Sequence, residues 1–185
     1  SGGHKNLFRF VKYLESFGCK CTIYIVKEFE IGLNTQEIQE KICDYFEDLK
    51  AEVKIYSPSE TYQADIVVCT AWITAYAALK FSANLKIYFV QDYEPLFYSK
   101  GSHWYLADNT YKFGFYHITL GSWLTKFLRE NHGVEADSYN IRVENKLYFP
   151  RQEILNKDIK TLCNNKNLTV CFYGRSVTPR RCFEL

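Results

Sequence analysis

The chain has 185 residues, of which 47% are hydrophobic and 17% aromatic, so it can bury the core of a folded domain. Its formal net charge of +2 comes without a basic cluster, which gives no reason to expect a nucleic-acid-binding protein. No apolar run approaches the roughly 18 residues that a membrane-spanning helix needs.

The cysteines indicate a reduced, cytoplasmic protein. There are seven, none forms a CxxC pair, and an odd number without framework spacing favours neither disulfides nor a zinc site. The sequence contains no methionine and opens on Ser1-Gly2-Gly3-His4 with no strand in front. We therefore expect a fragment of a longer protein.

The first elements alternate between helical and strand patterns. Apolar residues at helical spacing predict a helix over Lys5–Phe17, ended by Gly18. The β-branched and aromatic run Cys21–Val26 predicts a strand. Asn34 or Thr35 can then cap a helix with Glu37 in its first turn, and a short strand follows at Val53–Tyr56.

The same alternation continues through the middle of the chain. Strands are predicted at 64–69, 87–90 and 115–119, with a less certain one at 136–143, and helices at 74–81, 102–112 and 123–131. Strands that alternate with helices predict an α/β fold with a Rossmann-like, doubly wound and mostly parallel sheet covered by helices on both faces.

The pattern changes near Pro150. Residues 1–150 are predicted to form one Rossmann-like domain, and 151–167 form a polar linker. A new buried strand and a glycine-arginine loop predict that 168–185 are the truncated start of a second domain. With the first strand missing, the orphan strand of 168–173 could pair within the chain or with a neighbour, which makes a homodimer of the fragment an expectation.

The strand at Ile87–Val90 stops at Gln91-Asp92-Tyr93-Glu94, polar groups that a core does not tolerate. In open α/β sheets, ligands bind at the carboxyl ends of the strands. We therefore predict that Gln91, Asp92, Tyr93 and Glu94 share one rim with Gly2, Gly3, His4, Trp72 and Gly121.

Each group of rim residues suits a ligand with sugar and phosphate parts. Gly2 and Gly3 precede a helix whose free N–H groups can bind a phosphate or a sugar hydroxyl. Aromatic residues such as Trp72 and Tyr93 offer faces on which the C–H side of a sugar ring can stack. Arg175 and Arg181 flank a loop that could hold an anion.

Four stretches carry a family resemblance: SGGHKNLFRFVKYLE, FVQDYEPLFY, YLADNTYKFGFYHITLGSWL and FYGRSVTPRRCFEL. Together they resemble bacterial glycosyltransferases of family 4 in the GT-B class, in particular the rhamnosyltransferase group that includes WsaF. The resemblance covers nearly the whole chain. It implies paired Rossmann-like domains, of which this chain holds the acceptor-side domain and the start of the nucleotide-sugar-binding domain.

The resemblance also implies roles for the rim residues. Gly2, Gly3 and His4 match the family's glycine loop beside the donor phosphates and the reacting centre. Gln91, Asp92 and Glu94 lie where the family places polar groups around the transferred sugar or the acceptor. Arg175 and Arg181 match basic residues that contact the donor diphosphate, although Cys182 stands where glycine usually follows.

The implied activity is a retaining transfer of a sugar, such as rhamnose or another deoxyhexose, from a nucleoside-diphosphate donor to a hydroxyl of a glycan or lipid-linked acceptor. It implies bacterial surface polysaccharide synthesis in the cytoplasm, at the inner face of the membrane and with peripheral membrane association. No metal or other cofactor is implied. Because most of the donor domain is cut away, we expect the fragment alone to be inactive.

Two other classes fit part of the pattern. A nicotinamide-dependent oxidoreductase is also doubly wound, but it needs GxGxxG after a strand, which Gly2-Gly3-His4 does not supply. A non-catalytic carbohydrate-binding domain would share the aromatic residues, but not a phosphate-type arginine loop. Titration with nucleotide-sugars, NAD and free glycan separates the three classes.

Overall fold

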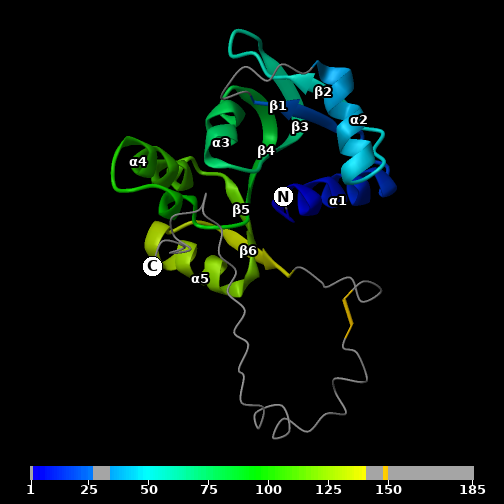
Figure 1. Cartoon of the computed structure of the whole chain (residues 1–185). Coiled ribbons are helices and arrows are strands. Elements are labelled where there is room, and N and C mark those ends of the chain that lie inside the picture. Colours follow the sequence, from blue (N-terminus) through cyan, green and yellow to red (C-terminus); the bar gives the residue numbers. More distant parts are fainter. Residues whose placement is uncertain (1, 27–33, 141–147, 150–185) are drawn as a thin grey trace, which may run out of the picture. The chain divides into compact units, whose positions relative to one another are not determined.

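The computed structural model describes residues 2–26, 34–140 and 148–149, and all its helices and strands lie between residues 2 and 140. The predicted linker, the predicted second domain, Arg175 and Arg181 lie outside the described residues. Strands and helices alternate along the chain as predicted, and every strand pairing is parallel (Figure 1). The α/β, Rossmann-like fold class is thus confirmed.

The helices are α1 (Gly2–Ser16), α2 (Thr35–Tyr45), α3 (Trp72–Ala78), α4 (Ser102–Asn109) and α5 (Gly121–His132), with short 3₁₀ helices η1 (Glu94–Phe97) and η2 (Thr110–Lys112). The strands are β1 (Thr22–Ile25), β2 (Glu52–Ile55), β3 (Tyr62–Cys69), β4 (Phe81–Val90), β5 (Tyr116–Leu120) and β6 (Ala136–Tyr139).

The strands form two sheets among the described residues, where a single sheet was expected. β1 pairs with β2, and a four-stranded sheet has the order β3-β4-β5-β6. Aromatic rings join the sheets: Tyr24 of β1 packs edge-on against Tyr62 of β3 and Phe81 of β4, with ring centroids 5.0 and 5.3 Å apart. Tyr62 and Phe81 are themselves stacked, with centroids 4.6 Å apart.

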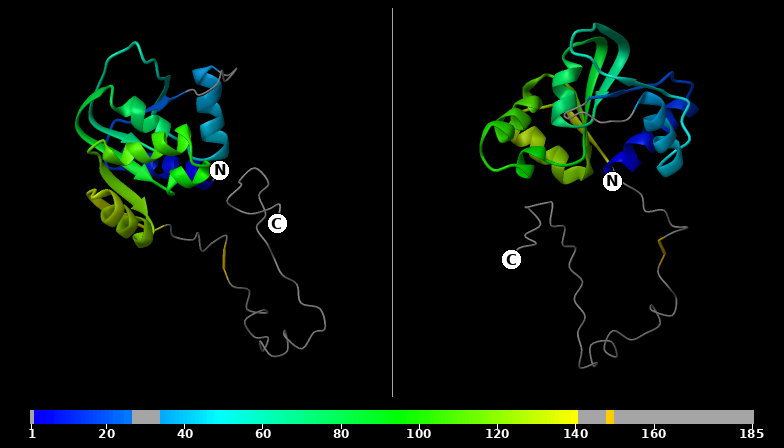
Figure 2. Two further views of the ribbon diagram at one scale, coloured as in Figure 1. Left: turned by 90° about the vertical axis from the view of Figure 1, so that its left-hand side faces the viewer. Right: turned by 45° about the horizontal axis from the view of Figure 1, so that its top comes forward.

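Each sheet has its own core. Ten buried residues that include Tyr88, Tyr111 and Leu128 form the core between the four-stranded sheet and the helices α3 and α5. Phe8, Ile42 and Val53 belong to a smaller core between α1, α2 and the two-stranded sheet. The right-hand view of Figure 2 shows α1 and α2 lying together, away from α4 and α5.

Two local details fix where helices of the four-stranded region end. β4 begins at Phe81 rather than at the predicted Ile87, because α3 ends early in a turn in which the Lys80 N–H donates to the Ala77 carbonyl. At the other end of the four-stranded sheet, α5 ends at Gly133 with φ of 64°, a left-handed conformation in which glycine is least strained.

Candidate functional site

The carboxyl ends of β3, β4 and β5 lie at one edge of the four-stranded sheet. The register pairs Cys69 with Tyr88 and Val90 with Thr119, so these strands end at nearly the same level. The segments that follow them hold the predicted residues Trp72, Gln91 to Glu94, and Gly121. Parallel pairing therefore brings these predicted residues to a shared edge, where open α/β sheets bind ligands.

The first turn of α1 reaches the same edge and contacts Gln91. The Gln91 amide donates to the Gly3 carbonyl at 3.4 Å, and the Asn6 amide donates to Gln91 Oε1 at 3.4 Å. A Cβ added to Gly3 would lie 3.2 Å from Gln91 Nε2, so this approach favours glycine. Gly2, the first residue of α1, lies beside this junction in the chain.

The predicted His4 turns to another side of α1. Its ring lies 6.3 Å from the ring of Phe8 and 6.3 Å from that of Phe46, next to the C-terminal end of α2. Burial lowers the pKa of His4 below its usual value. Gly3 and Asn6, three residues apart, share the face of α1 that meets Gln91.

Asp92 and Tyr93 lie side by side in the chain but in different surroundings. Asp92 Oδ1 accepts a hydrogen bond from the Tyr93 N–H at 2.9 Å, and Asp92 is half-buried at the edge. The Tyr93 ring is 7% exposed, and its hydroxyl donates to Asp108 Oδ1 at 2.6 Å. Burial, together with the bond to Asp108, raises the pKa of Tyr93. Tyr93 thus belongs to the core.

Glu94 is a buried carboxylate that holds the start of α3. Its Oε2 accepts a hydrogen bond from the Trp72 N–H at 2.8 Å. Burial raises the pKa of Glu94 to about 7, and the nearby charge of Asp92 adds to the rise. The Thr74 hydroxyl accepts from the Thr70 and Ala71 N–H groups at 2.8 and 2.9 Å, so the N–H groups of Thr70, Ala71 and Trp72 are all bonded to side-chain oxygens.

Trp72 is packed among aromatic rings and is 9% exposed. Its indole N–H donates to the Tyr98 hydroxyl at 3.0 Å, and the rings of Tyr76 and His103 meet it edge-on. One side of Trp72 lines an open, largely apolar depression of about 380 Å³ between α3 and α4, together with Ile73, Tyr76 and Leu106. Trp72 therefore contributes an apolar surface to the edge, and its indole N–H is already bonded to Tyr98.

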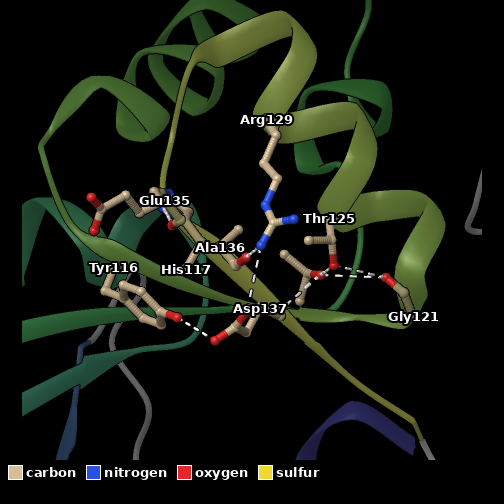
Figure 3. A network of polar contacts seen from close by, with 9 residues as sticks. Tyr116, His117, Gly121, Thr125, Arg129, Glu135, Ala136 and Asp137 are labelled. Atoms are coloured by element: carbon tan, nitrogen blue, oxygen red, sulfur yellow. Dashed lines mark hydrogen bonds and ion pairs between the residues drawn. The ribbon is translucent and has the colours of Figure 1, made fainter.

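Gly121 begins α5 with φ of +77°, a conformation that other residues rarely adopt. Its carbonyl accepts hydrogen bonds from the Thr119 and Thr125 hydroxyls, both at 3.3 Å, and the two hydroxyls lie 2.5 Å apart (Figure 3). These bonds fix the turn from β5 into α5.

A second group in Figure 3 ties α5 to the last strand. Arg129 donates to the Ala136 carbonyl and forms an ion pair with Asp137 at 3.5 Å, and Asp137 also accepts a hydrogen bond from the Tyr116 hydroxyl. The side chains of this group hold β5, β6 and α5 together.

Two residues at the edge were not among the predicted site residues. Asn6 follows the two glycines at the start of the first helix and was given no role of its own. Its spacing of three residues from Gly3 could have indicated that both lie on one helix face. Trp123 is 66% exposed in the first turn of α5, and its position directly after a strand end could have indicated it.

In residues 2–26, 34–140 and 148–149, no group of three or more histidine, cysteine or acidic side chains is placed to hold a metal ion. In the same ranges, every helix is too short or too polar to cross a membrane.

Comparisons with known proteins were made on the sequence. The family model of the WsaF N-terminal domain matches residues 26–122, more than half of the 185-residue chain. The O-antigen biosynthesis protein RfbC of Myxococcus xanthus is 37% identical over 122 residues, which are 65% of this chain. The chain spans only 9% of that protein's length.

Proposed function

Since this chain belongs to the WsaF N-terminal domain family, we propose that it is the acceptor-side part of a GT-B glycosyltransferase that acts in polysaccharide synthesis. The relative from Myxococcus xanthus is named as an O-antigen biosynthesis protein, which supports a role in polysaccharide synthesis. The observation that carries the proposal is the junction at which Gly3 and Asn6 of α1 meet Gln91 at the carboxyl edge of β4.

The proposed reaction moves rhamnose or another deoxyhexose from a nucleoside diphosphate to a hydroxyl of a glycan or lipid-linked acceptor, with retention at the anomeric carbon. The bond from that carbon to the diphosphate breaks, and the acceptor oxygen takes its place. These details rest on the resemblance of the glycine-led start and of the QDYEPLFY stretch to family 4 enzymes. The proposed setting is the cytoplasmic face of the membrane, by peripheral association.

The junction suits a diphosphate leaving group. The first-turn N–H groups and positive dipole end of α1 can offset the charge that develops on the diphosphate, and no metal ion is required for that role. Gly2 and Gly3 leave room for the donor to approach the backbone. Arg175 and Arg181, outside the described residues, are proposed to complete the diphosphate contacts.

The three predicted catalytic side chains receive different roles in this proposal. Asp92 lies half-buried at the edge, and we assign it to orient the acceptor hydroxyl and accept its proton. Glu94 positions α3 through the Trp72 N–H, and His4 supports α1 through its packing against Phe46. Both are therefore positioning residues.

The test uses the full-length enzyme with nucleotide-sugar donors. Gly3→Val places side-chain atoms against the Gln91 amide and should lower kcat/KM for transfer about 100-fold, the usual effect of displacing a positioning group by about an ångström. Gly101→Val is the matched control, because the nearest atom to a Cβ at Gly101 lies 3.8 Å away.

Three results would contradict the proposal. If Gly3→Val transfers sugar as fast as the parent, the junction does not serve the donor. If Asp92→Asn leaves turnover unchanged, Asp92 has no part in the chemistry. A parent enzyme that hydrolyses or transfers from no nucleotide-sugar would remove the glycosyltransferase assignment altogether.

A further inference from the structure

The aromatic residues predicted to line the edge, Trp72 and Tyr93, are buried, whereas Trp123, which was not predicted as a site residue, is exposed to solvent. Trp72 and Tyr93 are 9% and 7% exposed, and their polar atoms donate hydrogen bonds to Tyr98 and Asp108. Trp123 is 66% exposed. A flat ligand that needs an aromatic face at this edge therefore has a free face at Trp123 and little at the other two.

The exposed indole is held in place by a series of rings. Trp123 stacks on Phe127, with centroids 5.4 Å apart and planes 20° apart. Phe127 meets the Tyr93 ring edge-on at 4.8 Å, and Tyr93 stacks on the buried Tyr111 at 5.6 Å. Because these contacts fix the ring from one side, the open side is preorganised and loses little conformational entropy when a ligand binds.

Trp123 lies at the same edge as the proposed donor junction. β5 pairs with β4, and Val90 lies opposite Thr119, so the turn into α5 begins beside the end of β4. The left-handed conformation of Gly121 and its bonds to Thr119 and Thr125 fix that turn. The exposed Ser122 precedes Trp123 and adds a hydroxyl next to the indole.

The chemistry of this surface fits a sugar ring. An indole presents an apolar face with negative electrostatic character, which suits the C–H face of a pyranose, and its N–H can donate at the rim. The face carries no charge of its own to select a phosphate. We propose that Trp123 is the stacking platform for a pyranose ring of the glycan acceptor. That this glycan is the acceptor of a sugar transfer rests on the proposed function.

The test measures binding of glycans to the full-length protein without donor. The probes are trisaccharides built from rhamnose, mannose or glucose, titrated by calorimetry. Trp123→Ala should weaken binding about tenfold, which corresponds to about 1.4 kcal/mol, while Trp123→Phe keeps a ring and should stay within about threefold of the parent. Tyr105→Ala is the matched control, since Tyr105 is 62% exposed on α4.

A second readout separates stacking from a structural role. With acceptor varied, Trp123→Ala should raise the KM for acceptor while kcat and the KM for donor stay near the parent values, and its thermal unfolding midpoint should fall by only a few degrees, from the lost contact with Phe127. Equal trisaccharide affinity in Trp123→Ala and the parent overturns the proposal, as does a parent that binds none of the probes. Detergent or peptide binding that needs Trp123, without sugar binding, would assign the face to another ligand.

The two proposals fail in different ways. If Trp123→Ala loses trisaccharide binding but the parent transfers no sugar, Trp123 remains a sugar-binding platform and the glycosyltransferase assignment is wrong. Transfer that needs Gly3 but not Trp123 would do the reverse.

Discussion

The region of α1, β1, α2 and β2 and the region of β3 to β6 differ in how completely they are buried. The four-stranded region has a core that includes fully buried Tyr88, Val90 and Leu128. Among the described residues, the core of the two-stranded region has fewer buried members and depends on partly exposed neighbours such as Ile23 and Ile38. The predicted ligand edge lies where the two meet, so one side of it is rigid and the other is less tightly held.

The largest expected difference comes from matched cavities in the two cores. Leu128→Ala should cost about 4 kcal/mol of unfolding free energy, because a fully packed site cannot collapse around the lost atoms, and Ile42→Ala should cost about 2 kcal/mol. Urea unfolding of both variants measures the costs. Equal losses, or equally slow amide hydrogen exchange in β1 and β4, would break the comparison.

A smaller effect should appear within the better-packed region, at Glu94. Its pKa is raised from 4.5 to about 7, so the folded state binds the proton more tightly than the unfolded state. Stability should therefore fall as pH rises through that window, by roughly 3 kcal/mol if the whole shift is expressed.

Glu94→Gln serves as the comparison for that pH effect. The amide oxygen can still accept from the Trp72 N–H but does not titrate. Urea unfolding from about pH 4.5 to about pH 8 should give a flatter profile for Glu94→Gln than for the parent. Parallel profiles would show that Glu94 has no part in the pH dependence.

The smallest expected effect lies in the two-stranded region, at the start of α2. The Asn34 side chain accepts from the Glu37 N–H, and the Glu37 carboxylate accepts from the Asn34 N–H, both at 2.9 Å. Asn34→Ala removes this capping box and should cost about 1 kcal/mol. Gln36→Ala loses only an exposed hydrogen bond to Glu40 and should change the free energy of unfolding, measured by thermal denaturation, by less than about 0.5 kcal/mol. An equal response of both variants would argue against the cap.

Local signals in the sequence predicted local structure well. Of the two predicted caps of α2, Asn34 is the one present, and the predicted end of the first helix at Gly18 is present as well. The start of β4 was missed, because Ser82, Asn84 and Lys86 make the first half of that strand look polar; in the structure Ser82 and Asn84 are exposed and Lys86 is half-buried. The division into two sheets depends on pairing between distant segments, which no local pattern encodes.

The candidate site was predictable in position but not in exposure. Polar groups after buried strands correctly placed Gln91 and Asp92 at one edge, since parallel strands end together. The sequence did not reveal that Tyr93 and Trp72 are covered while Trp123 is open. Which ring is covered depends on neighbours such as Tyr98, Asp108 and Phe127, which are distant in sequence or belong to another element.

The rings of Tyr24, Tyr62 and Phe81 connect the two sheets across β1 and β3. A ladder of backbone hydrogen bonds sets both the spacing of two strands and which residues face each other. The edge-on contacts of Tyr24 set the spacing without such a ladder, because a ring edge against a ring face does not pair one backbone residue with another. In the part of the chain that the structure describes, aromatic side chains rather than strand pairing therefore hold β1 beside β3 and β4.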